Sequence, residues 1–249
     1  DTLDKVEQNR KECYIREFSI EHFHDSKVFE TLIPKICKIF REENEELTGF
    51  ENEEILAEYQ IYKTPGYVYM KGSVQIYSAG KQAADISAFP EGIAVAVGSE
   101  EDVPDICPDQ TIDKVFTIEN LTSFYRFKQE HSLVIYLGGY HNRSRRNLLM
   151  QIYQKLPDAQ YYHFGDLDAG GFYILEHLKR KTGIPFQMFQ MDIETLKKYE
   201  DYAKPLTEND KKRLMQLEKM ELPDEERKLI TYMLQKGIKL EQECISESQ

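Results

Sequence analysis

The second half of the chain alternates short apolar runs with amphipathic stretches. The apolar runs are rich in β-branched and aromatic residues, which is typical of strands, and the stretches between them repeat apolar residues at three- and four-residue steps, which is typical of helices. This alternation predicts βαβ units and therefore a parallel sheet that is covered by helices on both faces. The predicted strands are 114–120, 132–139, 159–166 and 184–192, and the predicted helices are 121–131, 144–156 and 169–183.

The first part of the chain begins with a different pattern. Residues 14–20 alternate as in a strand, whereas 25–47 and 52–61 carry the apolar spacing of helices. Pro34 lies inside the longer of these two segments and predicts a kink or a boundary there. The N-terminal segment is therefore expected to mix helices with a strand.

The period changes again before the regular βα series begins. Tyrosines and valines around Gly72 predict a hairpin over 67–80, and a further strand is expected at 91–98. The acidic stretch 99–114 contains two prolines and is the best candidate for a linker. We therefore expect a smaller α+β domain over 1–105 and an α/β domain over 106–249 whose tail is mostly helical and charged.

Composition narrows the class of protein. The chain has 249 residues, of which 41% are hydrophobic, so it can bury a sizeable core. No apolar run is long enough to predict a membrane span, and the polar N-terminal residues do not resemble a signal peptide. The four cysteines are scattered without a C-x-x-C pair, which suggests neither a zinc site nor a disulfide framework and fits a reducing, cytoplasmic setting.

The net charge of −12 argues against a nucleic-acid-binding protein, because such proteins usually carry a basic surface. A net charge is a sum, however, and it can hide a local basic patch. The stretch "HNRSRRN", residues 141–147, places three arginines within four positions. These arginines are interpreted either as a solvated loop and helix start or as contacts to phosphate groups, and the sequence leaves both open.

Acidic residues stand where two of the predicted strands end. Glu119 nearly closes the first strand, and Asp166 closes the third, with Asp168 two positions later. The carboxyl ends of parallel strands gather at one edge of a sheet, so these carboxylates meet if the first and third strands are neighbours. Carboxylates so near to one another repel and raise one another's pKa values, and a bound divalent cation removes this repulsion. Mg²⁺ prefers a few carboxylates together with waters and phosphate oxygens, so the pattern predicts a Mg²⁺ site for a phosphate group.

Plainer interpretations exist for each acidic residue. Asp168 could cap the helix that follows it, and Glu119 could face solvent. The combination favours the metal site, because a strand-end Glu, a Gly-Gly strand end and a G-D-x-D strand end follow one another in one βαβ series. Gly170 and Gly171 would also let a phosphate approach the start of the next helix.

Glu on the first strand and Asp-x-Asp on the third resemble the Toprim domain of topoisomerases, primases and related nucleases. The chain is more similar still to the nuclease subunit family of the Wadjet system, JetD. The motifs that carry this resemblance are "TIENLTSFY" (117–125), "LGGYHNR" (137–143), "FGDLDAGGFYIL" (164–175) and "KLEQECI" (239–245), with "REFSIEHFHDSKVFE" (16–30) and "YKTPGYVYMKGSV" (62–74) upstream.

The resemblance implies a fold and an activity. It implies a Toprim-like parallel sheet flanked by helices, preceded by a smaller winged-helix or CAP-like domain that contacts DNA. It also implies a Mg²⁺- or Mn²⁺-dependent endonuclease in which Glu119, Asp166 and Asp168 bind the metal. Relatives act beside an SMC-type motor complex and cut small circular plasmids, so double-stranded DNA and SMC-type subunits are the expected partners. Cutting both strands needs two Toprim sites, which implies a homodimer.

Further residues are candidates for supporting roles. Contacts to flanking phosphates are predicted for Arg143, Arg145, Arg146, Lys63 and Lys71. Residues that adjoin the motifs could support the site, and these are Asn120, Gly138, Gly139, His141, Glu241 and Glu243. For His141 the role of general base competes with a structural or exposed position, and for Glu241 and Glu243 metal binding competes with packing of the tail.

Two other classes of function stay open at this point. The chain could be a non-catalytic subunit that binds DNA or the SMC complex and keeps the Toprim shape for packing. It could also be a small-molecule phosphotransfer enzyme on a flavodoxin-like sheet, in which case a single domain with a small pocket is expected. An intact set of three strand-end acids favours the nuclease over the first alternative.

Overall fold

The computed structural model describes residues 1–249 except 45–46, 48–49, 64–65, 98–103, 139–142 and 246–249. The chain divides into two compact units. The smaller unit contains Asp1–Tyr67 and two short stretches that include Ala96–Val97 and Arg143–Leu148. The larger unit contains Val68–Val95, Pro104–Gly139 and Leu149–Gln249. This division differs from the predicted one at residue 105, because residues 68–95 belong with the larger unit.

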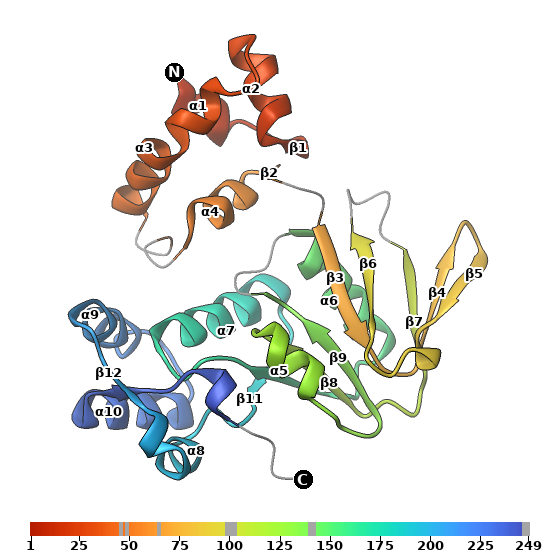
Figure 1. The fold of residues 1–249 in the computed structure, drawn as a ribbon, viewed down its shortest axis with the longest axis vertical. Helices are drawn as coiled ribbons and strands as arrows, with labels where there is room; N and C mark the ends of the chain where they lie inside the picture. Colours follow the sequence, from red (N-terminus) through yellow and green to blue (C-terminus); the bar gives the residue numbers. More distant parts are fainter. Residues whose placement is uncertain (45–46, 48–49, 64–65, 98–103, 139–142, 246–249) are drawn as a thin grey trace. The chain divides into compact units, whose positions relative to one another are not determined.

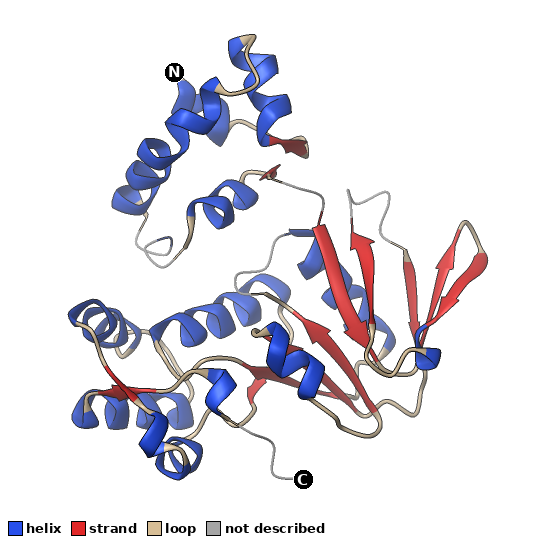
Figure 2. Cartoon of the chain, viewed as in Figure 1, coloured by secondary structure: helices blue, strands red, loops and turns tan. Residues whose placement is uncertain are grey.

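The larger unit is built on a six-stranded sheet with the strand order β11-β10-β8-β9-β3-β6 (Figures 1 and 2). The pairs β8–β9, β8–β10 and β10–β11 are parallel, and β3 runs antiparallel to β9. The predicted α/β class with a mostly parallel sheet is therefore confirmed, whereas the Toprim name stays a prediction. The strands are β3 (Gly66–Lys71), β6 (Ile93–Val97), β8 (Lys114–Ile118), β9 (Ser132–Tyr136), β10 (Gln160–Phe164) and β11 (Gln187–Met188).

Helices connect the parallel strands. They are α5 (Leu121–Arg126), α6 (Arg143–Lys155) and α7 (Ala169–Thr182). The chain moves from β8 to β9 in one direction along the sheet and from β10 to β11 in the other, so right-handed crossovers place α5 and α7 on opposite faces (Figure 1). Helix α7 ends at Gly183, whose φ of +70° is the left-handed conformation that a glycine adopts easily.

The core of the larger unit is aromatic. Phe116 on β8 lies 4.7 Å from Phe127 and 5.0 Å from Phe189 between ring centroids. Phe164, the last residue of β10, packs against the same two rings at 6.5 and 5.7 Å. Four of the five residues of β8 are buried, which explains why its sequence is a continuous apolar run rather than an alternating one.

The predicted hairpin over 67–80 is wrong. Its first arm is β3 in the large sheet, whereas its second arm, β4 (Val74–Ser78), pairs with β5 (Lys81–Asp85) and β7 (Asp105–Pro108) in a separate three-stranded sheet. Gly72 between the arms has a φ of +136°, and a Cβ there would lie 2.5 Å from the carbonyl oxygen of Ser132. This glycine therefore lets the chain leave one sheet for the other.

The hairpin of this region is formed by β4 and β5 instead. Its turn residues, Ala79 and Gly80, both have positive φ, at 49° and 74°, as a tight hairpin turn with the right-handed twist requires. The stretch predicted as a linker, 99–114, contains strand β7 of this smaller sheet, so Asp105–Pro108 are not part of a linker.

The smaller unit is mainly helical. Its helices are α1 (Thr2–Glu7), α2 (Ile15–Phe23), α3 (Val28–Glu43) and α4 (Asn52–Glu58), and β1 (Cys13–Tyr14) pairs in parallel with β2 (Ile61–Tyr62). The helices within 25–47 and 52–61 are confirmed, and Pro34 lies inside α3. Its description as a winged-helix or CAP-like domain stays a prediction.

The strand predicted over 14–20 is wrong, because this segment forms α2. The Glu17 carboxylate accepts a hydrogen bond of 2.8 Å from the Tyr14 N–H group and so closes the first turn of the helix. Ile15 and Phe18 are buried at the three-residue spacing of a helix. The apparent alternation of the sequence concealed this spacing.

The tail after β11 is mostly helical, as predicted, with α8 (Ile193–Lys198), α9 (Glu208–Leu217) and α10 (Asp224–Lys236). Short elements join these helices to the sheet: η3 (Glu200–Tyr202), the antiparallel pair of β12 (Lys204–Pro205) and β13 (Ile238–Lys239), and the 3₁₀ turn η4 (Gln242–Cys244). The last turn, η4, contacts α5. Across the described parts of the chain, no helix combines the length and the apolar character that crossing a membrane requires.

Candidate metal centre

The ends of β8 and β10 bring the first and third predicted strands together. The two strands are parallel neighbours whose last residues, Ile118 and Phe164, are paired. One residue further, the Glu119 N–H group donates to the Phe164 carbonyl at 3.0 Å. The Asp166 N–H group then points at Oε2 of Glu119, 3.4 Å away. The first and third predicted strands are therefore neighbours whose ends bring Glu119 and Asp166 to one edge of the sheet, with a contact from the Asp166 backbone; a meeting of the three carboxylates stays a prediction.

Gly165 makes room for this arrangement. A Cβ atom at this position would lie 2.6 Å from Oε2 of Glu119 and 2.9 Å from Nε2 of His163. Both distances are shorter than a carbon atom tolerates, so a side chain here would push the Glu119 carboxylate away. The glycine of the G-D-x-D motif is explained by this close approach.

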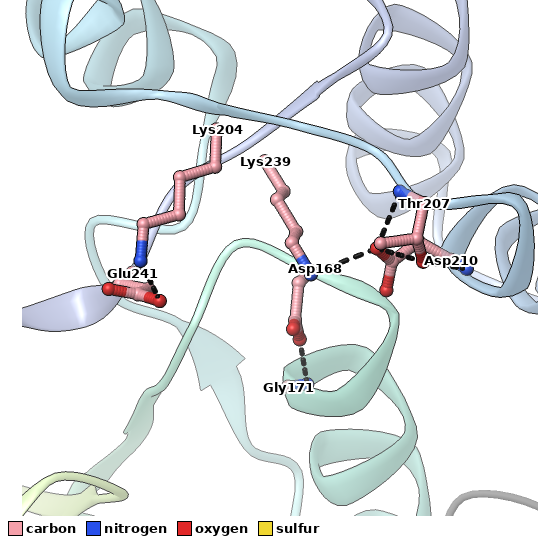
Figure 3. A network of polar contacts seen from close by, with 7 residues as sticks. All are labelled: Asp168, Gly171, Lys204, Thr207, Asp210, Lys239 and Glu241. Atoms are coloured by element: carbon pink, nitrogen blue, oxygen red, sulfur yellow. Dashed lines mark hydrogen bonds and ion pairs between the residues drawn. The ribbon is translucent and has the colours of Figure 1, made fainter.

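Asp168 caps helix α7. Its Oδ1 atom accepts a hydrogen bond of 2.9 Å from the Gly171 N–H group (Figure 3). Gly171 fits tightly under the turn, because a Cβ there would lie 2.2 Å from the carbonyl oxygen of Asp166. The capping interpretation of Asp168 is thus correct. It does not exclude metal binding, because the cap bond uses one of the two carboxylate oxygens.

Asp166 is the most perturbed acid at this edge. Burial raises the pKa of its carboxyl to about 6, and repulsion from Asp168, Glu243 and Glu241 adds to this rise. The Gln242 N–H group donates to Oδ1 of Asp166 at 2.7 Å and opposes the rise in pKa. A cation beside Asp166 would favour its charged form and would offset this rise in pKa.

Gln242 holds the two strand ends together, and it is not among the site residues predicted from the sequence. Its side chain is fully buried. Oε1 accepts from the Asn120 N–H group at 2.8 Å, and Nε2 donates to the Phe164 carbonyl at 3.0 Å. Each backbone group belongs to a segment that carries one of the acids. The signal in the sequence was a glutamine between Leu240 and Ile245, which are both buried.

The residues around Gln242 fasten the tail to the same edge. Leu240 and Leu167 exchange backbone hydrogen bonds of 2.9 and 3.1 Å, so the tail pairs with the chain between the two aspartates. The side chain of Asn120 donates to Glu243 at 2.5 Å and also caps α5. Asn120 therefore links the start of α5 to the tail, and its supporting role at a metal site stays a prediction.

Two lysines of the β12–β13 pair also lie at this part of the unit. Lys204 forms an ion pair with Glu241, and Lys239 forms one of 2.9 Å with Asp210, which in turn caps α9 with Thr207 (Figure 3). Both lysines stand opposite each other in the strand register. The contacts of Glu241 and Glu243 with Lys204 and Asn120 account for packing of the tail, and metal binding by these two acids stays a prediction.

The acids at this edge fit a divalent metal in kind and in charge. Glu119, Asp166 and Asp168 supply the oxygen donors that Mg²⁺ and Mn²⁺ prefer, and a cation would offset the raised pKa of the half-buried Asp166 carboxyl. Within the described ranges, however, no group of three His, Cys, Asp or Glu side chains is already gathered around a common point where a metal could sit. Metal binding at this edge would therefore require the carboxylates to turn toward one another.

The predicted phosphate contacts in the smaller unit are engaged elsewhere. Arg146 forms an ion pair of 2.8 Å with Glu58, and the two side chains are only 11% and 19% exposed. Arg145 donates to the Tyr67 carbonyl at 3.4 Å. Lys63 forms an exposed ion pair of 2.6 Å with Glu53. The placement of Arg146 in particular favours a structural role over a contact with DNA.

The position of Lys71 also does not suit a contact with a phosphate group. Its side chain is buried, and Nζ donates to the Phe124 carbonyl at 2.6 Å near the end of α5. The same ammonium lies 4.8 Å from the centre of the Phe124 ring. The lysine thus binds the last carbonyls of a helix. Gly138 follows β9 with a φ of +69°, whereas Gly139, His141 and the side chain of Arg143 lie outside the described residues.

Replacing Arg146 is expected to destabilise the protein. Arg146→Ala would leave the half-buried Glu58 carboxylate without this partner, at a cost of about 1–3 kcal/mol in the free energy of unfolding. Urea unfolding of both proteins measures this cost. Arg16→Ala is the matched control, because its ion pair with Glu30 is exposed and should contribute below about 1 kcal/mol. Equal losses in the two variants would contradict the structural role of Arg146.

Comparison with known proteins places this edge in a family context. The family model described as "Wadjet protein JetD, C-terminal" matches residues 102–249, which is more than half of the chain and includes every residue of the candidate centre. A curated relative, the Wadjet protein JetD of Bacillus cereus (strain Q1), is 29% identical over 235 residues. The match covers 92% of this chain and 56% of the relative, so the chain spans about half the length of that protein.

Proposed function

Because the chain belongs to the Wadjet JetD family, we propose that it is a metal-dependent DNA endonuclease that works as a component of a Wadjet system. The observation that carries the proposal is the meeting of Glu119 and Asp166 at the neighbouring ends of β8 and β10, with Asp168 two residues further on. Double-stranded circular DNA is the proposed substrate. Subunits of an SMC-type motor complex and a second copy of the chain are the proposed partners.

In the proposed mechanism, Glu119, Asp166 and Asp168 hold Mg²⁺ or Mn²⁺. When bound, such a metal polarises a phosphate group and lowers the pKa of a bound water. The protein's own contribution is orientation. The Gln242 N–H group fixes one oxygen of Asp166, and the Gly171 N–H group fixes one oxygen of Asp168, so each aspartate keeps a second oxygen for the metal. Because these bonds come from the backbone, they survive side-chain motion of the tail and of α7.

A second candidate function is a non-catalytic subunit that binds DNA or the SMC complex. It is favoured by one observation: within the described residues, no three potential ligands are gathered for a metal. The two candidates differ in their behaviour with metal. The nuclease requires a divalent ion and binds it at the strand ends, whereas the non-catalytic subunit has no such requirement.

The deciding experiment uses supercoiled plasmid and the purified chain. Nicked or linear products should accumulate with Mg²⁺ or Mn²⁺ and disappear with EDTA. Calorimetric titration with Mn²⁺ runs in parallel and reports binding without chemistry. Metal binding without cleavage would indicate that the chain needs its partners, and the assay would be repeated with them. Absence of metal binding would leave the non-catalytic subunit as the better proposal.

Two substitutions of Asp168 separate its cap from its role as a metal ligand. Asp168→Asn keeps the helix cap, because asparagine caps as well as aspartate, and it relieves repulsion on Asp166. Its thermal midpoint in EDTA should equal or exceed that of the wild type. Asp168→Ala loses the cap as well, at a cost of about 0.5–2 kcal/mol. Mg²⁺ should raise the wild-type midpoint more than that of either variant, because the ligand binds the folded state. If Mg²⁺ raises all three midpoints equally, Asp168 is a cap and not a ligand.

A further inference from the structure

A cavity adjoins the candidate metal centre in the larger unit. Its volume is about 590 Å³, which is in the range of sites for small molecules or single nucleotides and too small for a duplex. Residues of α5 and of the segment that follows it form one wall, and Phe164, Phe189, Gln190, Glu243 and Ile245 form the rest with Glu91. Apart from Glu243, none of these residues was assigned a function from the sequence.

The cavity has a cationic and aromatic rim. Arg126 and Lys128 are both exposed, and among the described residues Arg126 has no ion-pair partner. Tyr125, which precedes Arg126 in α5, is 42% exposed. A phosphate-bearing ligand with a flat ring matches this combination, since the cations attract the phosphate and the tyrosine offers a stacking surface.

Gln190 adds an observation of a different kind. Its Oε1 atom is buried and accepts no hydrogen bond within the described structure. Its φ of 53° places a non-glycine residue in the left-handed region, a strained conformation that needs support from its surroundings. A buried acceptor without a donor costs free energy, and a ligand that brings an N–H group into the cavity would remove that cost. Nucleobases carry such N–H groups.

The cavity is joined to the strand ends by two structural links. Asn120 follows Glu119 directly and begins α5, whose other end carries Arg126. Six helical residues span about 9 Å, and successive phosphates of one strand lie about 3.4 Å apart along a duplex axis. The second link is Glu243, which lines the cavity and accepts from Asn120. A strand held at the metal centre would therefore reach the cavity within about three nucleotides.

We propose that this cavity binds one unpaired nucleotide of the DNA strand held at the candidate centre, with the base against Tyr125 and its flanking phosphates at Arg126 and Lys128. The proposal rests on the proposed function, and it names single-stranded DNA beside the scissile phosphate as the ligand. Gln190 would accept a hydrogen bond from the base. Binding at this site would not depend on the base sequence of the DNA, because every base has a stacking face and most offer an N–H donor.

The test measures binding of a fluorescent single-stranded oligonucleotide by anisotropy, in EDTA so that cleavage is absent. Tyr125→Ala should weaken binding about 5- to 150-fold, whereas Tyr125→Phe should bind as the wild type does, because the stacking surface remains. Arg126→Ala with Lys128→Ala should weaken binding and reduce the slope of log affinity against log salt by about 0.7 per lost phosphate contact. Lys212→Ala with Lys228→Ala, which removes two exposed cations from α9 and α10, is the matched control and should leave the slope unchanged.

A second probe separates the base from the phosphate. For an oligonucleotide that lacks all its bases, Tyr125→Ala should have no effect, whereas the double cation variant should still weaken binding. The inference is overturned if the wild type does not bind the oligonucleotide, or if the cavity variants bind as tightly as the control. Calorimetric Mn²⁺ binding should be equal in all these proteins. Oligonucleotide binding that depends on the cavity, without metal binding by the wild type, would reject the proposed nuclease and retain the nucleotide site.

Discussion

Glu119→Gln and Asp166→Asn are each expected to reduce divalent-dependent cleavage of plasmid DNA to the background seen in EDTA. Both changes keep the size of the side chain and remove the charge that a divalent cation requires. The fold should survive, because the amide oxygen introduced by Asp166→Asn would still accept from the Gln242 N–H group and the ladder bond from residue 119 to Phe164 is made by the backbone. Plasmid nicking with Mg²⁺ and Mn²⁺ measures the effect, and circular dichroism measures the fold.

The same substitution of Asp166 should stabilise the metal-free protein. The Asp166 carboxyl has a folded pKa of about 6 against an ordinary value of 3.8, so the folded state binds a proton more tightly than the unfolded chain. Its charge therefore destabilises the fold, fully above pH 6 and not at all below the unfolded pKa. The difference corresponds to about 3 kcal/mol as an order of magnitude. In EDTA, the wild type should gain stability as the pH falls from 7 to 5, and Asp166→Asn should lack this gain.

Asp158→Asn is the control for both measurements, because Asp158 is exposed on the turn that precedes β10. It should cleave like the wild type and show no change in stability. Full cleavage by Asp166→Asn would contradict the proposed ligand set. A stability profile of Asp166→Asn that follows the wild type between pH 7 and 5 would show that burial of this carboxyl is not what the structure implies.

Gln242→Ala is expected to weaken Mn²⁺ binding about 10- to 100-fold, which is the usual loss when a group that orients metal ligands is removed. The side-chain amide bridges Asn120 and Phe164, so its loss lets the two strand ends move independently of each other. The Asn120 N–H group would also lose its partner, at a cost of about 1–3 kcal/mol in the free energy of unfolding, whereas the Phe164 carbonyl would keep its bond from the Glu119 N–H group.

Calorimetry with Mn²⁺, together with urea unfolding in EDTA, distinguishes orientation from simple destabilisation. The titration is done at a temperature where both proteins are fully folded, so that only orientation affects affinity. Gln216→Ala is the control, because this glutamine is exposed on α9. If Gln242→Ala is destabilised but binds Mn²⁺ like the control, Gln242 supports the fold and has no part in the metal centre.

The pattern of apolar residues within each segment correctly predicted the secondary structure that depends on that segment alone. The alternation of β8, α5, β9, α6, β10 and α7 was predicted because each element is amphipathic or apolar over its own length. This alternation in turn predicted that the ends of β8 and β10, which carry Glu119 and Asp166, lie at the same edge of the sheet. Pairing over long distances was not predicted. Residues on either side of Gly72 look like two arms of a hairpin, but their partners are strands far along the chain.

The same limit applies to the candidate site. Lys71 looks like an exposed cation in the sequence, and it is buried because α5, about fifty residues later, ends above it. Gln242 looks like a tail residue, and its role depends on contacts with Asn120 and Phe164 that no periodicity reveals. The acids could be found because they stand at the ends of predicted strands, whereas the groups that hold the acids come from elsewhere in the chain.

The position of Gln242 also has a consequence for protein synthesis. Its bonds to Asp166 and Asn120 span 76 and 122 residues of the chain. A ribosome therefore releases the segment with Glu119 and both aspartates well before the residue that aligns them. Domains begin to fold from the N-terminal side during translation, at about 5–20 residues per second. The nascent chain thus carries the acids for several seconds without Gln242, and a prematurely terminated product that ends before residue 242 never contains it. If the chain cuts DNA, this order delays the activity until translation has passed residue 242.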